Sequence, residues 1–97
     1  MTELFIFARF HARAGQESAV AEMLRDVVGP TREEPSCLAI DAFRSTRDAR
    51  LFYIHSRWTD ESAFERHSGL PHTVHFVERV APLLDHALDV TRTERIE

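Results

Sequence analysis

The sequence predicts a small α+β domain in which helices cover one face of an antiparallel sheet and the other face binds a second copy of the chain. Two observations predict this fold. Segments with strand-like alternation and segments with helical spacing follow one another in the order strand, helix, strand, strand, helices, strand, and a split βαβ arrangement accommodates that order directly. The strands also carry apolar residues on both of their faces. The chain has 97 residues, enough for one domain, so residues 1–97 are interpreted as a single domain.

The first half of the chain predicts a strand, a helix and a pair of strands. Residues 3–12 are rich in Phe and Ile, as expected of a strand. Residues 16–28 carry Val and Leu at helical spacing. Gly29-Pro30 is expected to stop or kink this helix because proline lacks the amide N–H, with a ragged last turn reaching residue 34 at most. Residues 37–45 and 51–59 predict two strands joined by a short polar loop of hairpin length.

The second half predicts two helices and a last strand. Thr59 or Asp60 is a natural N-cap for a short helix over residues 61–67. Pro71 is suited to the first position of a second helix, whose apolar stripe contains Phe76, Val77, Val80 and Leu84. Residues 86–95 predict the last strand. The complete order is that of a ferredoxin-like βαββαβ domain.

The two faces of the predicted sheet differ in what should cover them, because alternate side chains of a strand point to opposite faces. One parity is expected to face the helices: Leu4, Ile6, Ala8, Phe10, Leu38, Ile40, Ala42, Phe52, Ile54, Ser56, Trp58, Leu88 and Val90. The other parity forms a contiguous apolar and arginine-containing surface with Phe5, Phe7, Phe43, Tyr53 and Arg57. Such a mixture is typical of interface cores, so we expect a homodimer through this face. The alternative is singly exposed apolar residues, which are common.

Two histidines share the interface parity. For His11 and His55 we expect hydrogen-bond partners from Asp41 or from the second chain rather than a catalytic role.

The composition argues against several kinds of partner. The net charge is −4, and the 12 basic residues are scattered arginines, whereas nucleic-acid binding needs clustered positive charge. No apolar run approaches the roughly 20 residues that span a bilayer, and the first residues lack a signal-peptide pattern. The single cysteine, Cys37, excludes an intrachain disulfide. We therefore expect a soluble, cytoplasmic protein that binds neither nucleic acid nor membrane.

Four stretches carry a family resemblance. They are Ala14-Gly15, Thr31-Arg32-Glu33-Glu34-Pro35-Ser36-Cys37-Leu38, Arg57-Trp58-Thr59-Asp60, and His67-Ser68-Gly69-Leu70-Pro71-His72 with Phe76. In this order they resemble the antibiotic biosynthesis monooxygenase family of dimeric α/β-barrel proteins. The resemblance implies two sheets packed into a barrel across a dimer, and a pocket in each subunit between sheet and helices. It also implies oxidation of a small quinol, or of a phenolic or polyketide-like aromatic, with O₂ and without a cofactor.

Two departures from the family pattern bear on the function. Ser56 replaces a frequent Glu before the Arg-Trp pair, which puts any role of that carboxylate in doubt. The haem-degrading branch has an Asn and a Trp where this chain has Ala8 and, nearby, His67, which weakens a haem-degrading function. One alternative is a non-catalytic small-molecule-binding or stress-response dimer of the same fold. The other is an isomerase or haem-handling relative.

Cofactor-free oxygenation needs a base near neutral pKa and apolar walls around the substrate. His67 and His72 lie in the helical segment expected to cover the pocket and are the candidate catalytic bases. Candidate substrate-binding residues are Trp58, Ser56, Phe64, Phe76 and Phe10.

Each candidate also has a structural interpretation. The histidines lie at helix ends, where they can serve the backbone or the helix dipole, and the aromatic residues can be plain core. No metal site is expected, because no carboxylate shares the spacing of His72 and His75 before Glu78.

Overall fold

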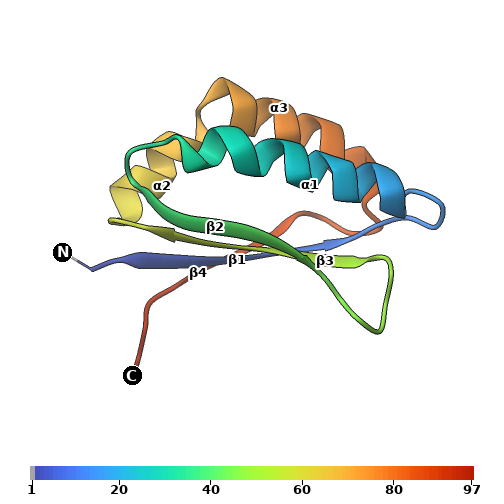
Figure 1. Ribbon diagram of the computed structural model, residues 1–97, viewed down its shortest axis with the longest axis horizontal. Coiled ribbons are helices and arrows are strands. Elements are labelled where there is room, and N and C mark those ends of the chain that lie inside the picture. The colour runs from blue at the N-terminus through green and yellow to red at the C-terminus, as the bar shows by residue number, and fades with distance from the viewer. Residues whose placement is uncertain (1) are drawn as a thin grey trace.

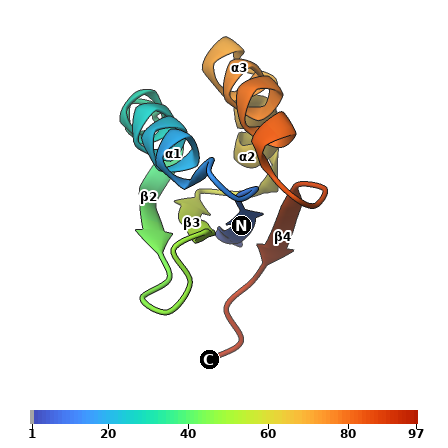
Figure 2. The same cartoon turned by 90° about the vertical axis from the view of Figure 1, so that its right-hand side faces the viewer.

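The computed structural model describes residues 2–97 and contains one four-stranded sheet. Its strands are β1 (Leu4–His11), β2 (Cys37–Arg44), β3 (Leu51–Trp58) and β4 (Asp89–Thr93), in the spatial order β2-β3-β1-β4 with every neighbouring pair antiparallel. The helices are α1 (Glu17–Arg32), α2 (Glu61–Ser68) and α3 (Pro71–Val80), followed by a 3₁₀ turn, η1 (Ala81–Leu83). All of them lie on one face of the sheet (Figures 1 and 2). This confirms the predicted ferredoxin-like βαββαβ fold.

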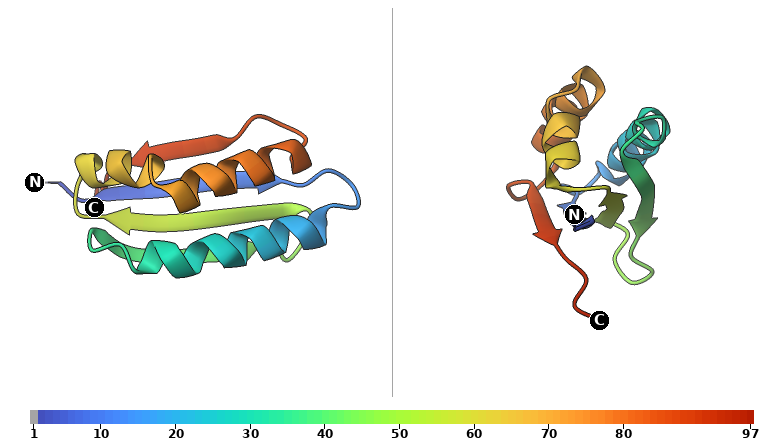
Figure 3. Two further views of the ribbon diagram at one scale, coloured as in Figure 1. Left: turned by 90° about the horizontal axis from the view of Figure 1, so that it is seen from above. Right: turned by 90° about the vertical axis from the view of Figure 1, so that its left-hand side faces the viewer.

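The helices divide the sheet between them. Seen from above, α1 lies along the β2 side of the sheet, and α2 and α3 lie along the β1 and β4 side (Figure 3). None of the helices formed by residues 2–97 is both long and apolar enough to cross a membrane.

The strand parity of the two central strands is confirmed. The alternate residues of β1 and β3 that were expected under the helices are all buried: Leu4, Ile6, Ala8, Phe10, Phe52, Ile54, Ser56 and Trp58. Burial of these apolar side chains against the helices is the main force that holds the two layers together.

Helix α1 does not stop at Gly29-Pro30 but continues to Arg32, within the last turn that the sequence allows up to residue 34. Proline removes one N–H, and the carbonyl that loses its partner belongs to Asp26, four residues earlier. Gly29, Pro30 and Asp26 all lie on the exposed face of the helix, where water can satisfy that carbonyl. The extra turn places Thr31 in the core, where its hydroxyl donates to the Val27 carbonyl at 2.7 Å.

Strand β2 differs from its predicted facing at Leu38. The pairing with β3 is irregular between Cys37 and Ala39, so Leu38 is an extra residue in the ladder. A bulged residue loses its place in the alternation, and Leu38 is 44% exposed instead of facing the helices. Ile40, two residues on, returns to the core.

Helix α3 and strand β4 are both shorter than the sequence predicts. The helix ends at Val80 because Pro82 leads into η1, yet Leu84 still reaches the core and forms an isolated bridge to Ala12. Strand β4 spans only Asp89–Thr93, not residues 86–95.

His11 is held within its own chain, which corrects the expectation that Asp41 or a partner would satisfy it. Its Nδ1 lies 2.6 Å from Asp85 Oδ2, and its Nε2 lies 2.9 Å from Asp48 Oδ2. Asp41 pairs instead with Arg32 at 3.0 Å. His55 also has an internal partner, since its Nδ1 lies 3.0 Å from the Ile6 carbonyl oxygen.

The His11 cluster should make the stability of the domain depend on pH. Hydrogen bonds to Asp85 and Asp48 raise the pKa of His11 above its usual 6.5. A raised folded-state pKa gives stability that is fully present below the unfolded pKa and is lost as pH rises through the folded pKa. We expect the melting temperature of the wild type to fall relative to that of His11→Gln as the pH rises from about 6 into the alkaline range. Parallel melting curves of the two proteins across this range would contradict the assignment.

Candidate active site

A cavity of about 350 Å³ lies between the sheet and the helices. Its walls come from every strand and from all three helices: Ile6, Ala8, Phe10, Val27, Thr31, Ile40, Ile54, Ser56, Phe64, His67, Ser68, Thr73, Phe76, Val77, Leu88, Val90 and Arg92. Most of these side chains are apolar. The volume lies within the range of about 300–1,000 Å³ of small-molecule pockets.

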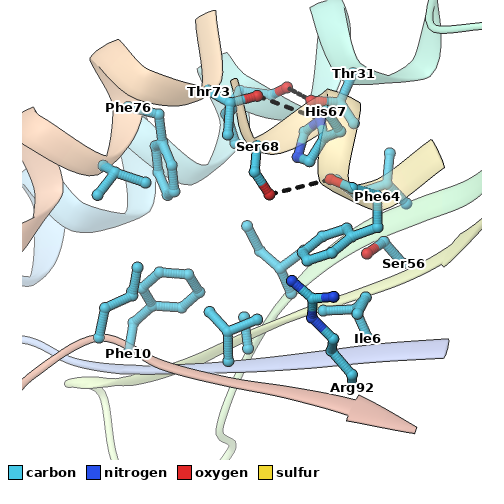
Figure 4. Close-up of a pocket in the computed structure, with 17 residues that line it drawn as sticks. Ile6, Phe10, Thr31, Ser56, Phe64, His67, Ser68, Thr73, Phe76 and Arg92 are labelled. Atoms are coloured by element: carbon cyan, nitrogen blue, oxygen red, sulfur yellow. Dashed lines mark hydrogen bonds between the residues drawn. The ribbon is translucent and has the colours of Figure 1, made fainter. Parts of the chain in front are cut away.

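Aromatic side chains form the two ends of this cavity (Figure 4). At one end Phe10 and Phe76 meet edge to face with ring centroids 5.9 Å apart. At the other end the guanidinium of Arg92 packs against the ring of Phe64, with its Cζ 5.2 Å from the ring centroid. Arg92 is anchored by Glu61 and Glu65 of α2. The cavity therefore combines flat apolar walls with one cation at its edge.

His67 is the titratable side chain that reaches furthest into the core of this site, and a carboxylate orients it. The residue is 8% exposed. Its Nδ1 lies 2.8 Å from Glu34 Oε2 and 3.2 Å from Thr73 Oγ1. An ionised carboxylate only accepts hydrogen bonds, so Nδ1 carries the hydrogen and Nε2 is left unprotonated. The close-up shows this second ring nitrogen facing the cavity (Figure 4).

The environment of His67 favours its neutral form. Burial lowers the pKa of His67 from its usual 6.5, while the hydrogen bond and charge of Glu34 act in the opposite direction. Burial is the larger effect. A neutral imidazole with a free nitrogen is the state that a general base requires at neutral pH.

Trp58 and Ser56 form a buried pair at one wall of the cavity, with Ser56 on the wall and Trp58 behind it. Trp58 Nε1–H donates to Ser56 Oγ at 3.0 Å. The Trp58 ring is completely buried and packs on His67 with centroids 4.5 Å apart. Ser56, itself on the cavity wall, therefore has its oxygen fixed by Trp58 and can still direct its own hydrogen toward a ligand.

The structure brings most of the predicted site residues together. Ser56, Phe64, His67, Phe76 and Phe10 contact the cavity. Trp58 and His72 do not: Trp58 supports Ser56 and His67 from behind, and His72 donates to Glu34 from the far side, with its Nε2 2.8 Å from Oε2. The roles of these residues in catalysis stay predictions.

Several residues of the site were missed from the sequence, among them Thr31, Arg92 and Glu34. Thr31 continues the Val20–Leu24–Val27 spacing by one turn, a signal hidden by the expectation that Pro30 ends the helix. Arg92 follows Leu88 and Val90 in strand parity. Glu34 has no periodic signal, since it lies in the turn between α1 and β2.

The fold and this cavity define a ferredoxin-like domain with a histidine–carboxylate pair beside an apolar pocket, and comparison with known proteins identifies its family. The model of the family described as antibiotic biosynthesis monooxygenase matches residues 4–79. The chain therefore belongs to the antibiotic biosynthesis monooxygenase family.

Individual relatives agree with this assignment. "Putative monooxygenase Rv0793" of Mycobacterium tuberculosis is 30% identical over 86 residues, which cover 89% of this chain and 84% of that protein. The crystal structure of PA3566 from Pseudomonas aeruginosa superposes with a TM-score of 0.92 at 31% identity, covering 100% of this chain and 97% of the other. The structure of Rv0793 superposes with a TM-score of 0.93 at 26% identity, covering 99% and 97%. Family and relatives together support a monooxygenase-like function.

Proposed function

We propose that this protein is a cofactor-independent monooxygenase that oxidises a small quinol or a phenolic, polyketide-like aromatic with O₂. The observation that carries the proposal is the position of His67, whose Nδ1 is held by Glu34 while its Nε2 faces an apolar cavity. A base in this setting can take the proton from a phenolic hydroxyl and leave an electron-rich anion.

The remaining steps follow from the reactivity of that anion. The phenolate passes one electron to O₂, giving a phenoxyl radical and superoxide. These combine at a ring carbon that carries hydrogen, and the peroxide loses water to leave a new carbonyl. One oxygen atom enters the product, the other leaves as water, and the substrate supplies the electrons. His67 takes up the proton in the first step and can return it to the departing oxygen.

The cavity walls suit an aromatic substrate and O₂. Phe10, Phe64 and Phe76 provide surfaces for ring stacking. Ser56 can donate a hydrogen bond to a substrate oxygen, and Arg92 adds positive charge that favours an anion. Water binds poorly in so apolar a cavity. Its exclusion protects the radical pair from side reactions with solvent.

The direct test is oxygen uptake by the purified wild-type protein after treatment with a chelator, across a panel of hydroquinones, naphthols and anthrols. We expect substrate-dependent O₂ consumption with a stoichiometry of one O₂ per aromatic oxidised. A protein that binds these compounds without consuming O₂ would instead support the alternative of a non-catalytic binding dimer.

We further propose that the chain acts as a homodimer through the helix-free face of the sheet. In the single chain Phe7 is 49% exposed, Phe43 53% and Tyr53 38%. Phe5 and Arg57 belong to the same face, and the Arg57 guanidinium lies over the Phe5 ring. A contiguous aromatic surface of this kind is unusual on a monomer, and its mixture of aromatic residues and arginine suits a second copy of the same face as the partner.

A further inference from the structure

We propose that Glu34, His67 and His72 form a binding site for one divalent transition-metal ion of the zinc class, and that occupation of this site switches off His67 as a base. Nothing in the sequence spacing predicts this site, because its carboxylate comes from the turn after α1 while its imidazoles come from α2 and α3.

The three ligand atoms are already close together. Glu34 Oε2 lies 2.8 Å from His67 Nδ1 and 2.8 Å from His72 Nε2, and all three atoms lie within 4.8 Å of one another. Zinc binds such atoms at about 2.0–2.2 Å, which in a tetrahedral site separates neighbouring ligand atoms by about 3.3–3.6 Å. A cation therefore needs only a small expansion of the cluster as it replaces the two shared hydrogens.

The kind and burial of the ligands also suit a metal ion. Two imidazole nitrogens and one carboxylate oxygen are a ligand set of zinc sites that keep an open fourth position. The side chains of Glu34 and His67 are 12% and 10% exposed, so they are held in place by their surroundings. Thr73 Oγ1, 3.2 Å from His67 Nδ1, is placed to hydrogen-bond a water on the metal.

The cluster is accessible from outside the catalytic cavity. The His72 side chain is 28% exposed and borders a separate hollow of about 120 Å³ between α1 and α3. His67 lines the larger cavity, whereas His72 does not. A cation can therefore enter beside His72 while a substrate occupies the larger cavity.

Metal binding would change what His67 presents to the cavity. A neutral imidazole carries one hydrogen, and a metal on Nδ1 forces that hydrogen onto Nε2. The nitrogen that faces the cavity then donates a hydrogen bond and can no longer accept a proton. The inhibitory consequence rests on the proposed function, whereas the binding of the metal does not.

The test is calorimetric titration of the metal-free protein with ZnCl₂, using His72→Gln and Glu34→Gln as variants and His75→Gln as the matched control. His75 lies on the same helix but outside the cluster. Outer-shell changes at metal sites cost about 10- to 100-fold in affinity, so losing a direct ligand should weaken binding by about 100-fold or more. We expect one Zn²⁺ per wild-type chain, a rise in melting temperature on binding, and an unchanged affinity in His75→Gln.

The proposal is overturned if the wild type shows no saturable binding of one Zn²⁺ per chain, or if His75→Gln loses as much affinity as His72→Gln. Circular dichroism shows whether His72→Gln or Glu34→Gln has unfolded. If one of them has, the zinc affinity of the other variant tests the proposal. In the activity arm, Zn²⁺ should stop quinol oxidation by the wild type and by His75→Gln but not by His72→Gln. A protein that binds Zn²⁺ yet oxidises no quinol contradicts only the proposed function, and one that oxidises quinols without binding Zn²⁺ contradicts only the metal site.

Discussion

Replacing His67 with Gln should lower the rate of quinol oxidation by about 10²- to 10⁴-fold, the contribution typical of a positioned general base. Gln can still donate a hydrogen bond to Glu34, as His67 Nδ1 does now at 2.8 Å, so the turn after α1 should stay in place. What Gln lacks is a nitrogen that accepts a proton near neutral pH. The loss should therefore appear in kcat for substrates whose hydroxyl is protonated.

A substrate that is already ionised provides the sharpest control for this prediction. If His67 only removes the phenolic proton, a phenol with a low pKa should be oxidised by the wild type and His67→Gln at similar rates, whereas a phenol with a high pKa should separate them. His75→Gln, the same substitution on an exposed position of α3, controls for general effects. Equal losses for both kinds of phenol would indicate that His67 shapes the cavity and does not act as the base.

Two further variants separate the groups around His67. Glu34→Gln removes the charge that fixes the Nδ1–H tautomer of His67 and should reduce the rate of quinol oxidation by about 10- to 100-fold.

His72→Gln should lower the rate of quinol oxidation less than His67→Gln does, because His72 contacts Glu34 and not the cavity. A larger loss in His72→Gln than in His67→Gln would assign the base to His72 instead.

The sheet was predictable from the sequence because its information is local and repetitive. Alternation in β1 and β3 identifies the buried side chains one by one, and Asp60 caps α2 as its position suggests, accepting from the Ala63 N–H at 2.8 Å. The errors lie where local rules compete with packing. Pro30 is tolerated because it lies with Asp26, whose carbonyl loses its helical partner, on the exposed face of α1, and Leu38 leaves the alternation because a bulge inserts one residue.

The candidate site was predictable only in part, because it is assembled from segments far apart in the chain. His67 and the aromatic walls follow from helix and strand positions near the pocket that the family resemblance implies. Glu34 is 33 residues from His67 and 38 from His72, and no spacing rule connects a turn residue to two helices. The tertiary fold alone brings this carboxylate between the two imidazoles and so decides which histidine nitrogen faces the cavity.

The second large effect is expected at the proposed dimer interface, where Phe7→Asp should convert the protein from a dimer to a monomer. Phe7 lies near the middle of the helix-free face and stacks on His55 with ring centroids 4.6 Å apart. A second sheet packed on this face would bury the new carboxylate without a partner, and an unpaired buried charge costs about 3–5 kcal/mol. That cost corresponds to a rise of about 10² to 10³ or more in the dissociation constant of the dimer.

Sedimentation equilibrium at micromolar concentration measures this change directly. The wild type should have twice the chain mass of 11.2 kDa, and Phe7→Asp should have the chain mass itself. Val74→Asp is the matched control, because Val74 is also an exposed apolar residue, 42% accessible, but lies on α3 away from this face. It should remain dimeric. The interface is elsewhere if Phe7→Asp stays a dimer, and it does not exist if the wild type sediments as a monomer. Because His67 and its cavity lie on the opposite side of the same sheet, a folded Phe7→Asp monomer would also reveal whether one chain can catalyse alone.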